Sequence, residues 1–199
     1  MVSWTFPELS NCLDAVSLNS LITERRSIRR FRRDPVSIEM VEQLLQLAVQ
    51  APSSMNGQPW EFVIVRDSDK LRALGRIKNH YCPNSKKNYP ASMFDTAPLA
   101  VVICVNEELA NERGVESAIF ATAYLQLTAH EQGLGSVYLS ADYKKAPGLS
   151  EDICRLLSIP KHVKPISILP LGYPDETPSK KELAPVKIFL DSYNENPWP

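Results

Sequence analysis

The sequence is poor in cysteine, and its cysteines are not placed for metal binding. They form no Cys-x-x-Cys pair, and no histidine lies at zinc-finger spacing from them, as a structural zinc site would require. A 199-residue chain can also bury enough core to fold without disulfides. We therefore expect no metal or iron–sulfur centre, and reduced thiols at Cys12, Cys82, Cys104 and Cys154.

Long hydrophobic runs and an excess of one charge are also missing. The longest apolar run, 99–105, is too short for a transmembrane helix, and no basic flank precedes an apolar signal segment at the N-terminus. The 22 basic and 23 acidic residues give a net charge of −1, so no overall field attracts nucleic acid or lipid. We expect a cytoplasmic protein without a membrane or nucleic-acid partner.

Two common signatures of enzyme chemistry are absent as well. None of His80, His130 and His162 belongs to a recognisable Ser/His/Asp or Cys/His arrangement. No Gly-x-Gly-x-x-Gly motif follows a strand, which argues against a Rossmann domain for a nicotinamide nucleotide. A nicotinamide would have to dock transiently on another group.

Hydrophobic periodicity predicts alternating helices and strands in one domain over residues 1–199. Ser37 and Ser68 are expected helix caps, and Pro52 should end the second helix by Ala51. This alternation by itself favours a parallel α/β sheet. Helices are expected over 15–25, 38–51, 68–77, 115–132 and 150–157, and strands over 61–65, 99–105, 136–140 and 166–171.

Three segments fall outside this regular pattern. Residues 1–14 form an N-terminal extension, and residues 80–98 hold three prolines and two adjacent lysines, which favours a mobile loop or lid. The 173–199 segment holds five prolines and is expected to be an extended arm. The helix over 115–132 is apolar nearly all round, as expected for a helix shared between subunits.

Two polar segments could carry chemistry. Residues 24–33, Glu-Arg-Arg-Ser-Ile-Arg-Arg-Phe-Arg-Arg, contain six arginines, whose guanidinium groups match phosphate oxygens. Residues 51–60, Ala-Pro-Ser-Ser-Met-Asn-Gly-Gln-Pro-Trp, offer hydroxyls and amides that suit the edge of a heteroaromatic ring. Each segment also has an ordinary interpretation, the first as a solvated face or nucleic-acid patch and the second as a polar loop.

Taken together, the two segments resemble the nitroreductase family. The resemblance rests on Arg-Arg-Ser-x-Arg-x-Phe and Pro-Ser-Ser-x-Asn-x-Gln-Pro-Trp, separated by one amphipathic helix. It continues through Ala-Pro at 97–98, the alanine-rich helix, Gly-Leu-Gly-Ser at 133–136 and Leu-Gly-Tyr-Pro at 171–174. It covers about residues 18–190.

The resemblance implies an α+β fold, a three-layer α/β/α sandwich with a mixed central sheet completed by the partner subunit's C-terminal arm. It also implies an obligate homodimer with noncovalent FMN at the interface. The implied activity passes hydride from NADH or NADPH through FMN to a small organic acceptor, such as a nitroaromatic or quinone, by a ping-pong mechanism. No catalytic side chain is implied, because the flavin carries the redox chemistry.

The same resemblance implies roles for individual residues. Arg25, Ser27 and Arg29 would hold the phosphate and ribityl chain, with Arg26 beside them, and Asn56 would face the pyrimidine edge of the flavin. Pro52, Ser53 and Ser54 of the partner subunit would cover the flavin, and Gln58 would support the Asn56 loop. The backbone of Leu134 and Gly135 would lie near flavin N5. Lys180 or Lys181 would contact the phosphate, with Lys187 as a further candidate. The glycines at 133 and 135 could equally be a helix C-cap.

Several alternatives stay open at this point. The scaffold also resembles flavin-destroying synthases of dimethylbenzimidazole and reductive dehalogenases of iodotyrosine, and FMN could be bound without turnover. The 80–95 stretch departs from the family pattern, which leaves the acceptor unidentified. Candidates for lining an acceptor pocket are Tyr81, Lys86, Lys87, Tyr89 and Met93.

Overall fold

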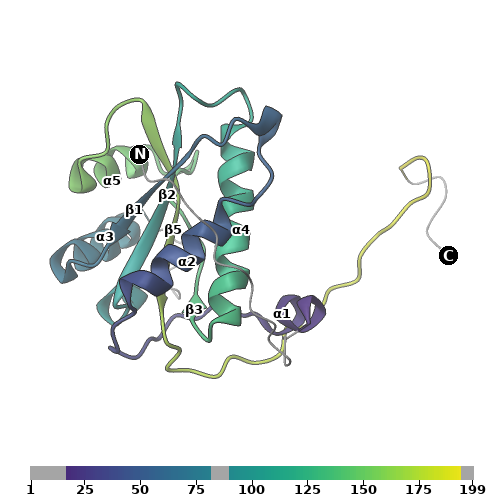
Figure 1. Cartoon of the computed structure of the whole chain (residues 1–199), viewed down its shortest axis with the longest axis horizontal. Helices are drawn as coiled ribbons and strands as arrows, with labels where there is room; N and C mark the ends of the chain where they lie inside the picture. Colours follow the sequence, from purple (N-terminus) through teal and green to yellow (C-terminus); the bar gives the residue numbers. More distant parts are fainter. Residues whose placement is uncertain (1–16, 82–89, 194–199) are drawn as a thin grey trace.

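A central sheet lies between two helical layers in the computed structural model, which describes residues 17–81 and 90–193. Helices α3 and α5 cover one face of the sheet, and α2 and α4 cover the other (Figure 1). The elements are α1 (Leu18–Glu24), α2 (Ile38–Ala48), η1 (Ser54–Asn56), β1 (Trp60–Val65), α3 (Ser68–His80), η3 (Ser92–Asp95), β2 (Leu99–Asn106), α4 (Gly114–Glu131), β3 (Gly135–Ser136), β4 (Leu139–Ser140), α5 (Leu149–Leu157) and β5 (Val163–Gly172).

The sheet has the strand order β1-β2-β5-β3, with β4 also paired to β5. All of these strand pairs are antiparallel, and an isolated parallel bridge between Ser27 and Ser136 makes the sheet mixed. The parallel sheet suggested by alternation alone is therefore wrong. Strand β2 pairs antiparallel to β1, although α3 and η3 lie between them in the sequence. Residue periodicity does not record the relative direction of two paired strands.

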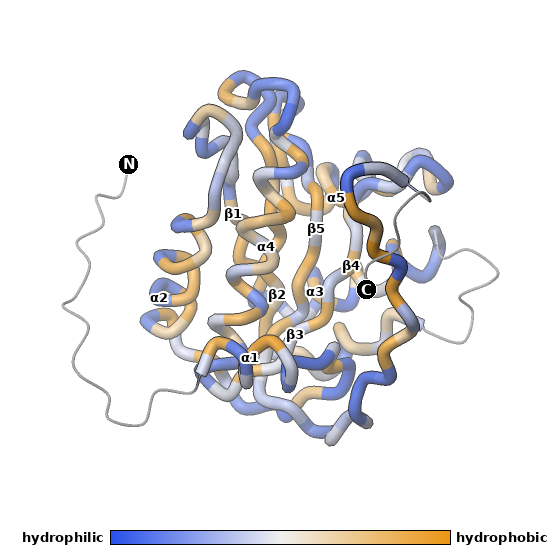
Figure 2. Tube along the Cα trace, turned by 90° about the vertical axis from the view of Figure 1, so that its right-hand side faces the viewer, coloured by the Kyte–Doolittle hydropathy of each residue, from blue (hydrophilic) through white to orange (hydrophobic). Residues whose placement is uncertain are grey.

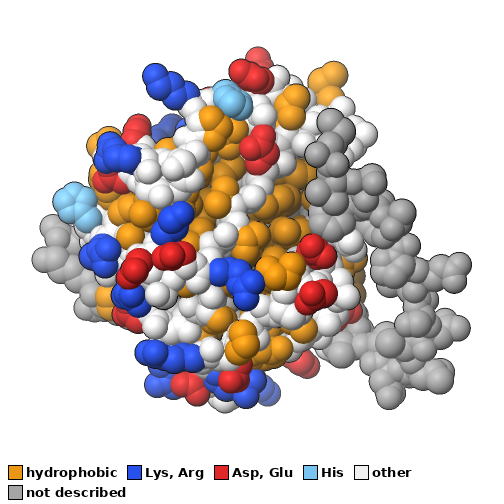
Figure 3. Space-filling model, turned by 60° about the vertical axis from the view of Figure 1, so that its left-hand side comes forward, with side chains coloured by type: hydrophobic (Ala, Val, Ile, Leu, Met, Phe, Trp, Pro, Cys, Tyr) orange, Lys and Arg blue, Asp and Glu red, His pale blue; other side chains and the backbone are white. Residues whose placement is uncertain are grey.

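The core consists of two clusters, one on each face of the sheet. Strand β2 belongs to both, because its seven residues from Leu99 to Val105 are all buried. This agrees with the continuous apolar run in the sequence. On the surface shown in Figure 3, acidic and basic side chains are interspersed around exposed hydrophobic ones, as a net charge near zero predicts.

The segment expected to be a lid is partly core. Met93 and Phe94 are 3% and 2% exposed and pack in the same cluster as α3 and α5, so the assignment of Met93 to an acceptor pocket is wrong. Tyr81 donates a hydrogen bond to Asp152 at 2.9 Å and fastens the end of α3 to α5. The other pocket candidates, Lys86, Lys87 and Tyr89, lie outside the described residues.

Local sequence signals place most element ends correctly. Ser37 caps α2 as expected, by accepting a hydrogen bond from Met40 N. Helix α3 is capped instead by Asp67, whose carboxylate accepts two backbone N–H bonds and outcompetes the neighbouring Ser68. Helix α5 has Gly148 as its N-cap residue, in a left-handed conformation with a φ of 92° and without a side-chain capping hydrogen bond. The strand expected over 136–140 is divided into β3 and β4.

After β5 the C-terminal segment first runs beside residues 26–32, which it contacts as far as Ser179, and then leaves the body of the protein. Residues 177–188 are exposed and have no regular secondary structure, and Figure 1 shows this segment extending away from the sheet and helices. Within residues 17–81 and 90–193, no helix is long and apolar enough to cross a bilayer.

Candidate functional site

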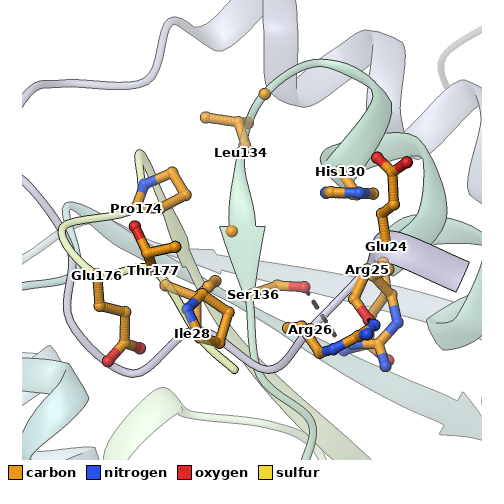
Figure 4. A pocket seen from close by; sticks show the side chains of 14 residues that line it. Glu24, Arg25, Arg26, Ile28, His130, Leu134, Ser136, Pro174, Glu176 and Thr177 are labelled. Carbon is orange, nitrogen blue, oxygen red and sulfur yellow. Dashed lines mark hydrogen bonds between the residues drawn. The ribbon is translucent and has the colours of Figure 1, made fainter. Parts of the chain in front are cut away.

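A pocket of about 250 Å³ lies between the 24–28 segment, the end of α4 with β3, and residues 174–178. Figure 4 shows Arg25 and Arg26 on one side, Pro174 and Thr177 on the other, and Leu134 and Ser136 between them. The full lining is Glu24, Arg25, Arg26, Ile28, Gln126, His130, Gly133, Leu134, Gly135, Ser136, Pro174, Glu176, Thr177 and Pro178. The pocket thus joins three segments that are far apart in the sequence.

The arginine-rich segment is extended and anchored by apolar side chains. Helix α1 ends at Glu24, and the chain then pairs with β3 through the Ser27–Ser136 bridge and a 3.1 Å hydrogen bond from Ile28 N to Ser136 O. Ile28 and Phe31 are buried. These anchors distinguish the segment from a freely solvated basic run, because they direct particular arginines toward the pocket.

Arg25 contributes an uncompensated positive charge to the pocket. Its guanidinium makes no hydrogen bond or ion pair within residues 17–81 and 90–193. Partial burial, and secondarily the nearby charge of Arg26, lower the pKa of Arg25, although an arginine stays protonated at neutral pH. A partly desolvated cation without a partner is unfavourable. An anion bound in this pocket would relieve that cost.

Arg26 uses its donors mainly on the protein itself. Its Nη1 donates to the carbonyl oxygens of Thr23 at 2.7 Å and Arg25 at 2.9 Å, and its Nε donates to Ser179 O at 3.3 Å. The side chain therefore closes the end of α1 and links it to the C-terminal segment. It lines the pocket while most of its hydrogen-bonding capacity is already committed.

The turn after α4 brings backbone to the pocket wall. Gly133 has a φ of 74°, and Leu134 N donates to Ala129 O at 2.8 Å, so Gly133 is the left-handed residue of a helix C-cap. The Leu134 side chain is buried in the core, and the residue lines the pocket. Gly135 has a separate role, because a Cβ at this position would lie 2.6 Å from Ile28 Cγ1.

We predict that Gly135→Ala loosens the contact between β3 and the 25–28 segment. Because Ile28 is buried and the added Cβ overlaps it, the free energy of unfolding should fall by about 1–3 kcal/mol, as measured by urea denaturation. Gly133→Asn is the matched control, since the Cβ position there is open and Asn tolerates positive φ. An equal loss in both variants would contradict the assignment of the packing role to Gly135.

The second polar segment forms a compact loop before β1. Ser54 N donates to Ser117 Oγ at 3.2 Å, and Asn111 Nδ2 donates to Ser54 O at 3.0 Å. Gln58 Nε2 donates to Asn56 Oδ1 at 2.9 Å. Hydrogen bonds to α4 and to the turn before it therefore support the loop. The Met55 side chain of the loop is 90% exposed.

The backbone of this loop is strained. Met55, Asn56 and Gln58 all have positive φ, between 44° and 55°, a region that costs free energy for residues other than glycine. The hydrogen bond that Ser117 Oγ accepts from Ser54 N and the one that Asn111 donates to Ser54 O offset this cost. An exposed, strained and well-supported loop is typical of a binding surface.

The structure does not bring the two polar segments together within one chain. The loop contacts Ser117 near the beginning of α4, whereas Gln126 and His130 near its end line the pocket. With a rise of 1.5 Å per residue, Ser117 and His130 are about 20 Å apart along the helix. One chain thus carries the pocket and the loop, two candidate partial sites, at opposite ends of the same helix.

The other predicted site residues have more peripheral positions. The Arg29 side chain is exposed, and Pro52, Asn56 and Gln58 are exposed on the loop, with Ser53 and Ser54 partly buried. Lys180 and Lys181 are exposed in the C-terminal segment, directly after the Ser179 carbonyl that Arg26 contacts. None of these residues lines the pocket.

Sequence reasoning missed several residues that shape these partial sites. Ser117 and Asn111 support the loop, and Glu176 and Thr177 line the pocket. No local pattern marks them, because each acts through a contact distant in sequence. Among the described residues, no group of three or more His, Cys, Asp or Glu side chains is placed to hold a metal ion.

Comparison with known proteins identifies the family. The family model described as Nitroreductase family matches residues 22–173. A protein of Methanothermobacter thermautotrophicus, provisionally named an NADH dehydrogenase/NAD(P)H nitroreductase, is 33% identical over 175 residues, covering 86% of this chain and 85% of that protein. The iodotyrosine deiodinase of Thermotoga neapolitana is 30% identical, covering 82% of this chain and 91% of that protein.

A solved structure agrees with these sequence matches. The FMN-dependent nitroreductase of Clostridium difficile R20291 aligns with a TM-score of 0.72 and 30% identity, covering 83% of this chain and 92% of that one. The α+β sandwich expected from the resemblance is thereby confirmed. The chain belongs to the nitroreductase family.

Proposed function

We propose that this protein is an FMN-dependent oxidoreductase that takes hydride from NADH or NADPH and delivers it to a small organic acceptor. The observation that carries the proposal is the partly buried Arg25 guanidinium in the pocket, which has no partner among residues 17–81 and 90–193. It provides a charge-assisted donor for a phosphate oxygen. The names of the Clostridium difficile structure and of the Bacillus subtilis FMN reductase [NAD(P)H], which is 26% identical, support FMN and NAD(P)H.

The donor set of the pocket fits an FMN phosphate and ribityl chain. Arg25 would bind the phosphate, and Ser27 and Arg29, which are neighbours of the pocket wall and do not line it, would add donors at the edge of the site. Backbone of Leu134 and Gly135 would face the flavin ring. When bound, FMN supplies the two-electron chemistry, and these residues hold and orient it.

One chain does not enclose the whole cofactor. Its pocket of about 250 Å³ is smaller than the roughly 300–1,000 Å³ typical of ligand sites. The second partial site would complete it from the partner subunit, with Pro52, Ser53 and Ser54 covering the flavin and Asn56 at its polar edge. Gln58 would keep the Asn56 side chain oriented through the hydrogen bond between them.

The exposed side of α4 supports this pairing of subunits. Val115, Ile119, Phe120 and Tyr124 are between 38% and 50% exposed and recur at the spacing of one helix face. Figure 2 shows α4 and α1 on the side turned toward the viewer. If two copies of α4 pack antiparallel about a two-fold axis, the loop at the beginning of one helix meets the pocket at the end of the other.

The C-terminal segment would extend this interface. Leu183, Val186 and Ile188 are 80%, 79% and 48% exposed, a large apolar exposure for a segment without a covering layer. Strand β1 lies at an edge of the sheet and could accept this arm from the partner. Lys180 and Lys181 remain the proposed basic residues of the arm, because they follow the segment that lines the pocket.

Purified protein is expected to show the absorbance spectrum of bound FMN. NADH or NADPH should bleach that spectrum, and a nitroaromatic compound or a quinone should restore it. Because donor and acceptor would share one open face, initial rates at several fixed acceptor concentrations should give parallel double-reciprocal lines. A colourless protein that takes up no FMN at micromolar concentration would contradict the proposal. A flavoprotein that NAD(P)H cannot reduce would indicate a protein that binds FMN without catalysis.

A second candidate function is reductive deiodination of an aromatic substrate. The iodotyrosine deiodinase of Thermotoga neapolitana is as similar in sequence as several nitroreductases, and an iodotyrosine deiodinase structure with FMN and 3-iodo-L-tyrosine aligns with a TM-score of 0.75 at 26% identity. Assaying 3-iodo-L-tyrosine beside the nitroaromatic under the same reducing conditions separates the two. Iodide release at a comparable rate would favour the deiodinase.

A further inference from the structure

The beginning of the C-terminal arm is paired with the arginine-rich segment. Arg32 N donates to Tyr173 O and Asp175 N donates to Arg30 O, both at 2.9 Å, around an antiparallel bridge between Phe31 and Pro174. Backbone pairing of this kind fixes the register of the two segments. It stops at Asp175, between Pro174 and Thr177, which both line the pocket.

The side chain of Glu176 continues the pairing where the backbone stops. Its Oε1 accepts a hydrogen bond from Arg29 N and a second one, at 3.2 Å, from Arg30 N. Its Oε2 lies 3.8 Å from Arg30 Nε, but the Arg30 side chain is 69% exposed, so this ion pair contributes little. The main partners of the carboxylate are therefore two backbone N–H groups, in hydrogen bonds strengthened by its charge.

Both segments joined by Glu176 are walls of the pocket. Arg25, Arg26 and Ile28 come from the first segment, and Pro174 and Thr177 from the second. Figure 4 shows Glu176 below Thr177, directed away from Arg25 and Arg26. Within the described part of the chain, its carboxylate thus accepts hydrogen bonds from backbone N–H groups and forms no ion pair with Arg25 or Arg26.

We propose that Glu176 is a positioning residue that couples cofactor binding to the path of the C-terminal arm. The proposal rests on the FMN site proposed above. By holding residues 29 and 30 against the arm, the carboxylate sets the distance between the two pocket walls. A bound cofactor that contacts both walls would in turn stabilise the direction in which the arm leaves the pocket.

The first test compares FMN dissociation constants, measured by flavin fluorescence quenching. Glu176→Ala should weaken FMN binding at least about tenfold, because it removes two charge-assisted hydrogen bonds. Glu176→Gln should stay within about threefold of wild type, because its amide oxygen can still accept both bonds. Glu151→Ala, an exposed acid on α5, is the control and should not change the affinity. Equal binding by Glu176→Ala and wild type would overturn the proposal.

The second test measures the coupling itself. Trypsin cleavage after Lys180 and Lys181 should be slowed at least fivefold by saturating FMN in wild type, and less than twofold in Glu176→Ala at its own saturating FMN concentration. Equal protection of both proteins would contradict the coupling.

Hydrogen exchange in the wild-type protein without FMN gives a measurement that does not depend on any variant folding. The backbone amides of Arg29 and Arg30 should exchange at least tenfold more slowly than their intrinsic rates. Exchange at intrinsic rates would contradict the hydrogen bonds from these amides to Glu176. If the wild-type protein binds no FMN, the proposed function fails, and this measurement still decides whether Glu176 holds the two segments.

Discussion

Protein carrying Phe120→Glu is expected to be monomeric and to lose its flavin. Phe120 is 50% exposed in the middle of the apolar side of α4, where a two-fold axis would place it near its symmetry mate. Obligate interfaces commonly bury roughly 2,000–5,000 Å² or more. Burying even a neutral polar group without a hydrogen bond costs at least about 2 kcal/mol, and burying an unpaired carboxylate costs more. Separating the subunits would also separate the pocket of one subunit from the loop of the other, which together would form the site.

Light scattering coupled to size-exclusion chromatography, with simultaneous flavin absorbance, measures both effects. Tyr143→Glu is the matched control, because Tyr143 is 42% exposed, is also aromatic and lies beyond the α4 surface. It should remain a yellow dimer. A Phe120→Glu monomer that keeps stoichiometric FMN would show that one chain is sufficient for the site, contrary to the proposed arrangement.

Arg25→Ala is expected to weaken FMN binding at least about tenfold, because a charge-assisted hydrogen bond contributes roughly 1.5–3 kcal/mol. The FMN affinity of Arg25→Lys should lie between those of the wild type and Arg25→Ala, since lysine keeps the charge but cannot donate bidentately to a phosphate. Titration of FMN into each apoprotein provides the dissociation constants. The free energy of unfolding should change little, because Arg25 makes no side-chain hydrogen bond or ion pair in the described part of the chain.

Arg33→Ala tests whether position or overall charge matters. Arg33 belongs to the same basic run but is exposed and does not line the pocket. Its removal should leave FMN affinity within about twofold of wild type, since exposed charges interact weakly in water. Equal losses in Arg25→Ala and Arg33→Ala would mean that a diffuse basic surface attracts the cofactor, and that the pocket geometry has no special role.

The family and the general position of its elements could be predicted because their signals are local. The Ser37 cap, the buried run from Leu99 to Val105 and the end of α1 at Glu24, next to the expected Arg25, all depend on neighbouring residues. The two polar motifs are also local, and their combination was specific enough to identify the family. Such signals are reliable because capping, burial and backbone restriction act within a few residues.

Predictions failed where a distant segment decides the outcome. Met93 looked like part of a polar, proline-containing lid, but η3 places it in the core against α3. The antiparallel direction of β2 relative to β1 depends on pairing between strands that α3 and η3 separate in the sequence. In both cases the hydrophobic pattern is compatible with two arrangements, and only the packing of the complete chain distinguishes them.

By itself, the sequence determined which chemical groups this protein has for a flavin site, and the family to which it belongs. It also determined most helix and strand ends, because these follow from hydrogen bonding and burial over short stretches of chain. Only the tertiary structure decided that Arg25 has no partner in the part of the chain that the structure describes, that Glu176 binds the backbone at Arg29, and that the two motifs lie at opposite ends of α4. These features depend on contacts between residues far apart in the chain, and such contacts form only when the sheet and its two helical layers have packed together.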